Sequence, residues 1–148
     1  MSIGLAVAWR PGPAPVRTRE YLATKACLLT GAQGITDPAA IPAWSGMQQA
    51  SLRTRAKVQY LPVTGPATVA NSTPFLNTLI ASGCAVIVAA GDIPAKTVSA
   101  QASLHPSQAF VLIGSTAGHP NITAVNGEDR DISARVEALV SAEVSGKE

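Results

Sequence analysis

The chain has 148 residues, of which 47% are apolar and 14% are charged, and its net charge is +2. This length and composition fit one globular domain with its own core, and they exclude a disordered chain and a coiled coil. The sequence has no basic run and few aromatic residues, which argues against nucleic-acid binding. We therefore expect no nucleic-acid partner.

The N-terminal residues 1–9, MSIGLAVAW, are apolar and precede an Arg/Pro-rich stretch at 10–24. The apolar run is too short to cross a bilayer. One interpretation is the end of a membrane segment or signal sequence, followed by a juxtamembrane linker. The other is a loose N-terminal arm. The first interpretation predicts an extracytoplasmic, membrane-anchored protein, whereas the chain would be cytoplasmic if Met1 is its true start.

Strand and helix patterns alternate along residues 25–146, which we expect to form one α/β domain. The predicted strands are ACLLTG (26–31), KVQYLPVT (57–64), CAVIVAAG (84–91), AFVLIGS (109–115) and NITAVN (121–126). The predicted helices are 42–55, 73–83, 93–106 and 129–144. This order indicates a doubly wound parallel sheet of about five strands, in a flavodoxin-like or periplasmic-lobe order.

Individual residues predict where several strands and helices lie or end. Pro62 cannot donate a hydrogen bond within a sheet, so its strand should lie at the sheet edge. Thr73 and Pro74 predict the N-cap and first residue of the second helix, and Gly83 predicts its left-handed C-terminus.

The two cysteines, Cys27 and Cys84, each open an apolar run and should lie near the beginning of two neighbouring parallel strands. Their sulfur atoms could then meet near one edge of the sheet. A disulfide fits an exported protein, and two buried thiols fit a cytosolic one. The membrane-like N-terminus favours the disulfide. Two cysteines without clustered histidines do not make a metal site.

Three glycine-containing loops should converge beyond the carboxyl ends of the strands, where sheets of this type bind ligands. The loops are 30–37, 91–93 and 114–118. The same residue types are also common in tight strand–helix turns without a ligand. The candidate ligand-binding residues are Thr30, Gly31, Gln33, Gly34, Asp37, Gly91, Asp92, Ser115 and Thr116.

Known catalytic and cofactor motifs are missing from the sequence. GAQG at 31–34 lacks the third glycine and the downstream acid of a dinucleotide fingerprint, and neither a P-loop lysine nor a nucleophile elbow occurs. We therefore expect a non-enzymatic domain without a cofactor or metal. Two alternatives remain: a small α/β enzyme that uses Asp37 and Asp92 as acid and base, and a cytosolic flavodoxin-like or receiver-like domain. Gly31, in place of an acid after the first strand, argues against the receiver.

The stretch CLLTGAQGITDPAAIPAWSGMQQA resembles the start of the basic membrane lipoprotein family of periplasmic binding proteins. That family serves ABC transporters and often binds purine nucleosides. The matching residues are Thr30, Gly34, Ile35, Asp37 and the Ala43-Trp44-x-Gly46 stretch. CAVIVAAGDIP, HPSQAFVLIGS and NITAVNGEDRDISARVEAL are similar to later segments, so the resemblance covers roughly residues 26–140.

The chain also departs from that family. Ala39, Ala40 and Ile41 stand where members have a Phe-Asn pair, and Gly31 and Gly114 replace two aspartates. We expect only the first of the family's two lobes. The resemblance implies a lobe that binds a small polar ligand such as a nucleoside, or a sensor or interaction module. It also implies an ABC-transporter or membrane partner, and a homodimer of two lobes would rebuild a cleft.

Overall fold

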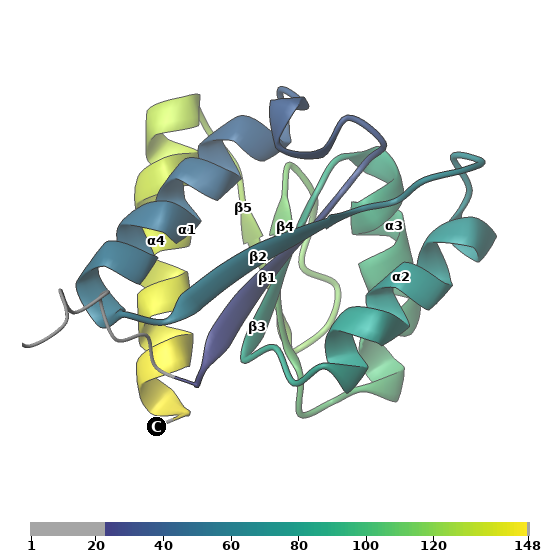
Figure 1. Cartoon of the computed structure of the whole chain (residues 1–148). Helices are drawn as coiled ribbons and strands as arrows, with labels where there is room; N and C mark the ends of the chain where they lie inside the picture. The colour runs from purple at the N-terminus through teal and green to yellow at the C-terminus, as the bar shows by residue number, and fades with distance from the viewer. Residues whose placement is uncertain (1–22, 148) are drawn as a thin grey trace, which may run out of the picture.

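Strands and helices alternate in the computed structural model, except that the last two strands follow each other with no helix between them; the structure describes residues 23–147 (Figure 1). The strands are β1 (Lys25–Thr30), β2 (Lys57–Pro62), β3 (Val86–Ala90), β4 (Ala109–Ile113) and β5 (Ile122–Val125). The helices are α1 (Ala40–Thr54), α2 (Val69–Ala81), α3 (Asp92–Gln101) and α4 (Asp129–Gly146). Two short 3₁₀ helices, η1 (Gly34–Thr36) and η2 (Ala102–Leu104), precede α1 and follow α3.

All five strands are parallel and pair in the order β2-β1-β3-β4-β5. This order confirms the expected doubly wound α/β fold and is consistent with a single periplasmic-binding-like lobe. β2 lies at one edge, as its proline predicts, and Pro62 pairs with Thr30 at the end of the strand. The strand order reverses between β1 and β3, so the carboxyl ends of these two strands mark the expected ligand site.

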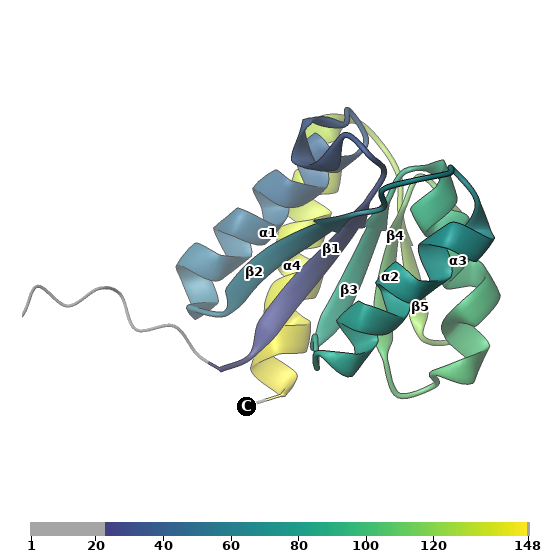
Figure 2. The same ribbon diagram turned by 45° about the vertical axis from the view of Figure 1, so that its right-hand side comes forward.

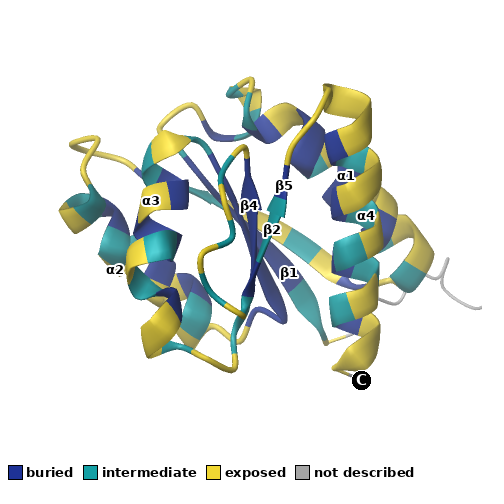
Figure 3. Cartoon of the chain, turned by 180° about the vertical axis from the view of Figure 1, so that it is seen from behind, coloured by how far each residue is buried: buried dark blue, intermediate teal, exposed yellow. Residues whose placement is uncertain are grey.

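Helices cover both faces of the sheet, with α1 and α4 on one side and α2 and α3 on the other (Figures 1 and 2). Successive side chains of a strand point to opposite faces. In β1, Ala26 and Leu28 therefore join the core beneath α1 and α4, and Cys27 and Leu29 join the core beneath α2 and α3. Figure 3 shows the buried residues on the strands and on the inward sides of the helices.

The last helix follows the sequence pattern closely. Ile132, Val136, Val140 and Val144 recur every four residues along α4 and are all buried in the core. This spacing places them on one face of a helix. The prediction of an amphipathic helix at 129–144 is therefore confirmed.

The predicted beginning of the second helix is wrong. α2 begins at Val69, and Thr68 is its N-cap: the Thr68 hydroxyl accepts a hydrogen bond of 3.1 Å from the Asn71 backbone N–H. Pro74 lies inside the helix and so removes one backbone hydrogen bond. The earlier start is stabilised by the Asn71 side chain, which donates to the carbonyl oxygens of Thr64 and Pro66. The predicted left-handed Gly83 is confirmed, with a φ of 80°.

Cys27 and Cys84 form a disulfide between β1 and the residues just before β3, with a Cα–Cα distance of 5.9 Å. Both side chains are buried in the core beneath α2 and α3. The bond lies toward the amino ends of the strands, away from the loops of the expected ligand site. The sequence-based preference for a disulfide is confirmed.

The expected membrane segment at 1–9 and nearly all of the linker at 10–24 lie outside the described residues. Within residues 23–147, none of the helices is both long enough and apolar enough to cross a membrane.

Candidate ligand-binding site

A small cavity lies at the carboxyl ends of β1, β2 and β3, where the strand order reverses. Its volume is about 210 Å³. We call it the aspartate cavity, because it contains two acidic side chains from different loops. It is lined by Gly31, Ala32, Asp37, Val63, Gly65, Ala67, Gly91, Asp92, Ile93 and Pro94.

The local backbone fixes the carboxylate of Asp37. Asp37 lies between η1 and α1, and its Oδ1 accepts a hydrogen bond of 3.0 Å from the Ala39 N–H. Its backbone carbonyl accepts the N–H groups of Ala40 and Ile41, which anchors the start of α1. The other oxygen, Oδ2, faces Gly31: a Cβ atom added there would lie 3.4 Å away. Glycine at position 31 thus leaves room beside this carboxylate.

Asp92 is brought to the same cavity by an abrupt turn from β3 into α3. Gly91 alone connects the two elements, with a φ of 109° that side-chain-bearing residues rarely adopt. Asp92 is therefore the first residue of α3, where the helix dipole stabilises a negative charge. Its carboxylate forms an exposed ion pair of 3.1 Å with Lys96.

A second hollow of about 510 Å³ adjoins the aspartate cavity, because Gly91 and Asp92 line both. We call it the lysine hollow. It is lined by Ala39, Gly91, Asp92, Ala95, Lys96, Ser99, Ile113, Gly114 and Ser115. It joins the loop after β4 to the loops after β1 and β3, so the expected convergence of three glycine-containing loops is present.

The structure brings together five of the nine predicted ligand-binding residues. Gly31, Asp37, Gly91 and Asp92 line the aspartate cavity, and Ser115 lines the lysine hollow with Gly91 and Asp92. The other four residues line neither space: Thr30, Gln33, Gly34 and Thr116.

The structure shows why two of these four residues do not line the cavity. Thr30 is fully buried, and its hydroxyl donates to the carbonyl oxygen of Gly31 at 2.8 Å. Gly34 has a φ of 60°, and a Cβ atom added to it would meet the Tyr60 ring at 3.5 Å. Both residues therefore shape the first loop without facing the cavity.

Sequence reasoning missed the loop between β2 and α2. Val63, Gly65 and Ala67 form one wall of the aspartate cavity. The Asn71 amide fixes this loop through hydrogen bonds of 2.6 Å to Thr64 and 3.0 Å to Pro66. The Gly65-Pro66 pair signals a turn, but an edge strand gave no reason to expect that its loop would reach the site.

The polar groups of the two spaces limit what they can bind. Of the described residues, two carboxylates and one ammonium group are the charged side chains that line them. Among residues 23–147, no aromatic side chain lines either space. That part of the chain also contains no group of three metal-ligating His, Cys, Asp or Glu side chains. The arrangement is suited to accepting hydrogen bonds from a small polar molecule.

No family model matches the sequence, and no curated protein matches it. The fold is similar to the crystal structure of a fragment from Peptoclostridium difficile 630 that is provisionally described as a lipoprotein. The TM-score is 0.68 at 17% sequence identity, and the match covers 81% of this chain and 98% of that one. This likeness shows a shared α/β fold. Membership of the basic membrane lipoprotein family remains a prediction.

Proposed function

We propose that the chain is a non-enzymatic binding lobe that holds a small polar ligand in the aspartate cavity. The observation that carries this proposal is that Asp37 and Asp92, from separate loops, line one cavity at the strand-order reversal. Carboxylates accept hydrogen bonds, so the ligand should present hydroxyl or ammonium groups. The volume of about 210 Å³ is below the range of drug-sized sites, roughly 300–1,000 Å³. The ribose hydroxyls of a nucleoside are hydrogen-bond donors of the kind that the two carboxylates could bind.

The proposal includes a relationship to the nucleoside-binding basic membrane lipoproteins and an extracytoplasmic, membrane-anchored location. The resemblance of the first loop, including Thr30, Gly34 and Asp37, supports the relationship. The disulfide between Cys27 and Cys84 supports an oxidising compartment, where such bonds persist. An ABC transporter or another membrane protein would then be the partner.

A single lobe encloses a small molecule less completely than a closed two-lobe cleft does. We infer that two copies pair with their carboxyl-end loops facing each other, which would increase enclosure. Size-exclusion chromatography with light scattering, with and without adenosine, tests this pairing. A strict monomer under both conditions contradicts it.

Nuclear magnetic resonance titration with adenosine, D-ribose and ethanolamine tests the binding site. We expect at least one of these probes to shift the amide signals of Gly31, Gly65 and Gly91. Asp37→Asn and Asp92→Asn should each weaken binding about tenfold, because each loses a charge-assisted hydrogen bond. Asp129→Asn, on the exposed start of α4, is the matched control and should bind normally. Unchanged affinity in both cavity variants contradicts the proposal.

A second candidate function rests on the same two carboxylates. Two carboxyl groups in one cavity can act as general acid and general base when their environments differ. If the chain is such an enzyme, Asp37→Asn or Asp92→Asn abolishes turnover and leaves affinity nearly unchanged. The binding-lobe proposal predicts the reverse, namely a loss of affinity with no turnover of the bound probe.

A further inference from the structure

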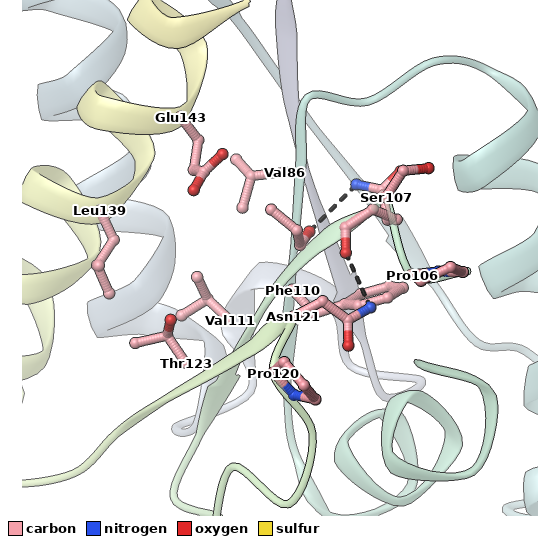
Figure 4. Close-up of a pocket in the computed structure, with 12 residues that line it drawn as sticks. Val86, Pro106, Ser107, Phe110, Val111, Pro120, Asn121, Thr123, Leu139 and Glu143 are labelled. Atoms are coloured by element: carbon pink, nitrogen blue, oxygen red, sulfur yellow. Dashed lines mark hydrogen bonds between the residues drawn. The ribbon is translucent and has the colours of Figure 1, made fainter. Parts of the chain in front are cut away.

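A separate pocket of about 310 Å³ lies at the opposite end of the sheet, between the amino ends of β3, β4 and β5 and the last turns of α4 (Figure 4). We call it the amino-end pocket. It is lined by Val86, Pro106, Ser107, Gln108, Ala109, Phe110, Val111, Pro120, Asn121, Thr123, Leu139 and Glu143. None of these residues lines the aspartate cavity or the lysine hollow.

One part of this pocket is apolar. Val86 and Val111 come from neighbouring central strands and are nearly fully buried, and Leu139 of α4 is half-buried. Figure 4 shows Leu139 on the helix and the two valines on the sheet around the same space. Because the two valines are already covered by the protein, Leu139 and the half-buried Ala109 supply the apolar surface that a ligand can contact.

The amide donors of the pocket are already engaged. Gln108 Nε2 donates to the carbonyl oxygens of Cys84 and Ala109 at 3.0 and 3.1 Å. Asn121 Nδ2 lies 2.9–3.0 Å from three carbonyl oxygens, those of Ala102, His105 and Gln108. Each amide therefore has only its oxygen, an acceptor, left for a ligand.

Glu143 supplies a carboxylate that makes no ion pair with the described residues. It is half-buried, lies in the last turn of α4 and forms no salt bridge with any of residues 23–147. A carboxylate at this end of a helix is unfavourable, because the helix dipole is negative there. The last turn of α4 has no basic residue, and no lysine, arginine or histidine of the described part of the chain lines the pocket.

We propose that the amino-end pocket binds a small organic ammonium ion with an apolar body, such as a short alkylamine. Glu143 is its counter-ion, with the helix dipole adding to the attraction. Leu139 and Ala109 contact the hydrocarbon. The remaining amide oxygens favour a ligand that donates hydrogen bonds, and an anion would meet the Glu143 charge. This site is independent of the aspartate cavity.

Titration of the ¹⁵N-labelled full chain with hexylammonium tests the proposal, with neutral 1-hexanol and anionic hexanoate as matched probes. We expect hexylammonium to shift the amide signals of Val111, Thr123 and Glu143, with a dissociation constant on the order of 1 mM. Hexanol should bind about fivefold more weakly, and hexanoate more weakly still. Glu143→Gln should weaken hexylammonium binding about fivefold without changing the affinity for hexanol.

Glu128→Gln is the control variant, because Glu128 is an exposed acid at the other end of α4 and should not affect binding. Equal affinity for hexylammonium and hexanol overturns the proposal, as does unchanged binding by Glu143→Gln. Hexylammonium shifts confined to Gly31, Gly65 and Gly91 also overturn it, since they would place the cation in the aspartate cavity. The proposal is also overturned if hexylammonium at up to about 20 mM shifts none of the amide signals.

Discussion

The backbone of Gly46 in α1 lies directly against the carbonyl oxygen of Ser133 in α4, and this contact sets how closely the two helices pack. A Cβ atom added to Gly46 would collide with that oxygen and would lie 3.0 Å from the Cβ of Val136. The neighbouring hydroxyls of Ser45 and Ser133 are 3.4 Å apart. Only a residue without a side chain allows the two helices this close approach.

Gly46→Ala is expected to lower the free energy of unfolding by about 1–3 kcal/mol, because the added methyl group forces the helices apart. Without this contact, alanine would stabilise the helix by about 1 kcal/mol relative to glycine. The sign of the change in the free energy of unfolding therefore tests the contact. Urea unfolding measures it. Gly146→Ala is the control, since a Cβ atom there would meet nothing within 4 Å. A more stable Gly46→Ala variant would show that the helices do not pack this closely.

Reduction of the disulfide is expected to lower the free energy of unfolding by about 4 kcal/mol. The bond joins residues 57 positions apart, and closing a loop of this length removes much entropy from the unfolded chain. Urea unfolding with and without a phosphine reductant measures the difference. The Cys27→Ala/Cys84→Ala double variant is the control and should not respond to the reductant. Identical curves for the unsubstituted chain in both buffers would contradict this expectation.

Asn121→Asp is expected to destabilise the fold by about 2–3 kcal/mol at neutral pH. The substitution removes the Asn121 Nδ2 donor and places a carboxylate against the carbonyl oxygens of Ala102, His105 and Gln108. These oxygens should raise the pKa of the new carboxyl group above its unfolded value of about 3.9. Its neutral form can donate, so the loss should be smallest below that value and grow as pH rises through the folded pKa.

Thermal unfolding between pH 3.5 and pH 7, compared with the unsubstituted chain, tests this dependence. Asn126→Asp is the control, because the exposed Asn126 makes a single 3.4 Å hydrogen bond to the carbonyl of Ser115. A stability difference that does not vary with pH would argue that Asn121 acts by shape alone.

Ser72→Ala is expected to stabilise the protein by about 1 kcal/mol. Ser72 is fully buried in α2, and its hydroxyl has no hydrogen-bond partner among residues 23–147. Alanine removes the cost of that unpaired group and is a better helix former. Thr97→Ala is the comparison: Thr97 is equally buried, but its hydroxyl donates to the Ile93 carbonyl at 2.7 Å. Calorimetry should show opposite signs, and a loss of stability in both variants would contradict the prediction.

Much of the fold could be predicted because its signals are local. The uninterrupted apolar run of β3 indicated a strand covered on both faces, and all five of its residues are buried. Pro62 indicated an edge strand, which β2 is. The predicted start of α2 was wrong because threonine is a good N-cap residue at both position 68 and position 73. The side-chain amide of Asn71 donates to the carbonyl oxygens of Thr64 and Pro66 and so fixes the turn before Thr68, which favours Thr68 as the N-cap.

The candidate site was only partly predictable. Asp37 and Asp92 follow two strands whose carboxyl ends meet, so the sequence indicated that they would lie near each other. No sequence signal indicated that Thr30 would be fully buried or that the loop at 63–68 would form a wall of the cavity. The amino-end pocket was not predicted at all, because Glu143, Val86 and Thr123 are far apart along the chain.

The sequence by itself determined the alternation of strands and helices, the parallel sheet and the neighbouring positions of Cys27 and Cys84. These features follow from apolar periodicity, turn residues and the handedness of crossovers, which act over short stretches of chain. Only the tertiary structure decided which side chains face a cavity, which amide donors are already engaged and how closely α1 approaches α4. Those outcomes depend on packing between segments distant in sequence, where the position of each side chain is set by its neighbours in space.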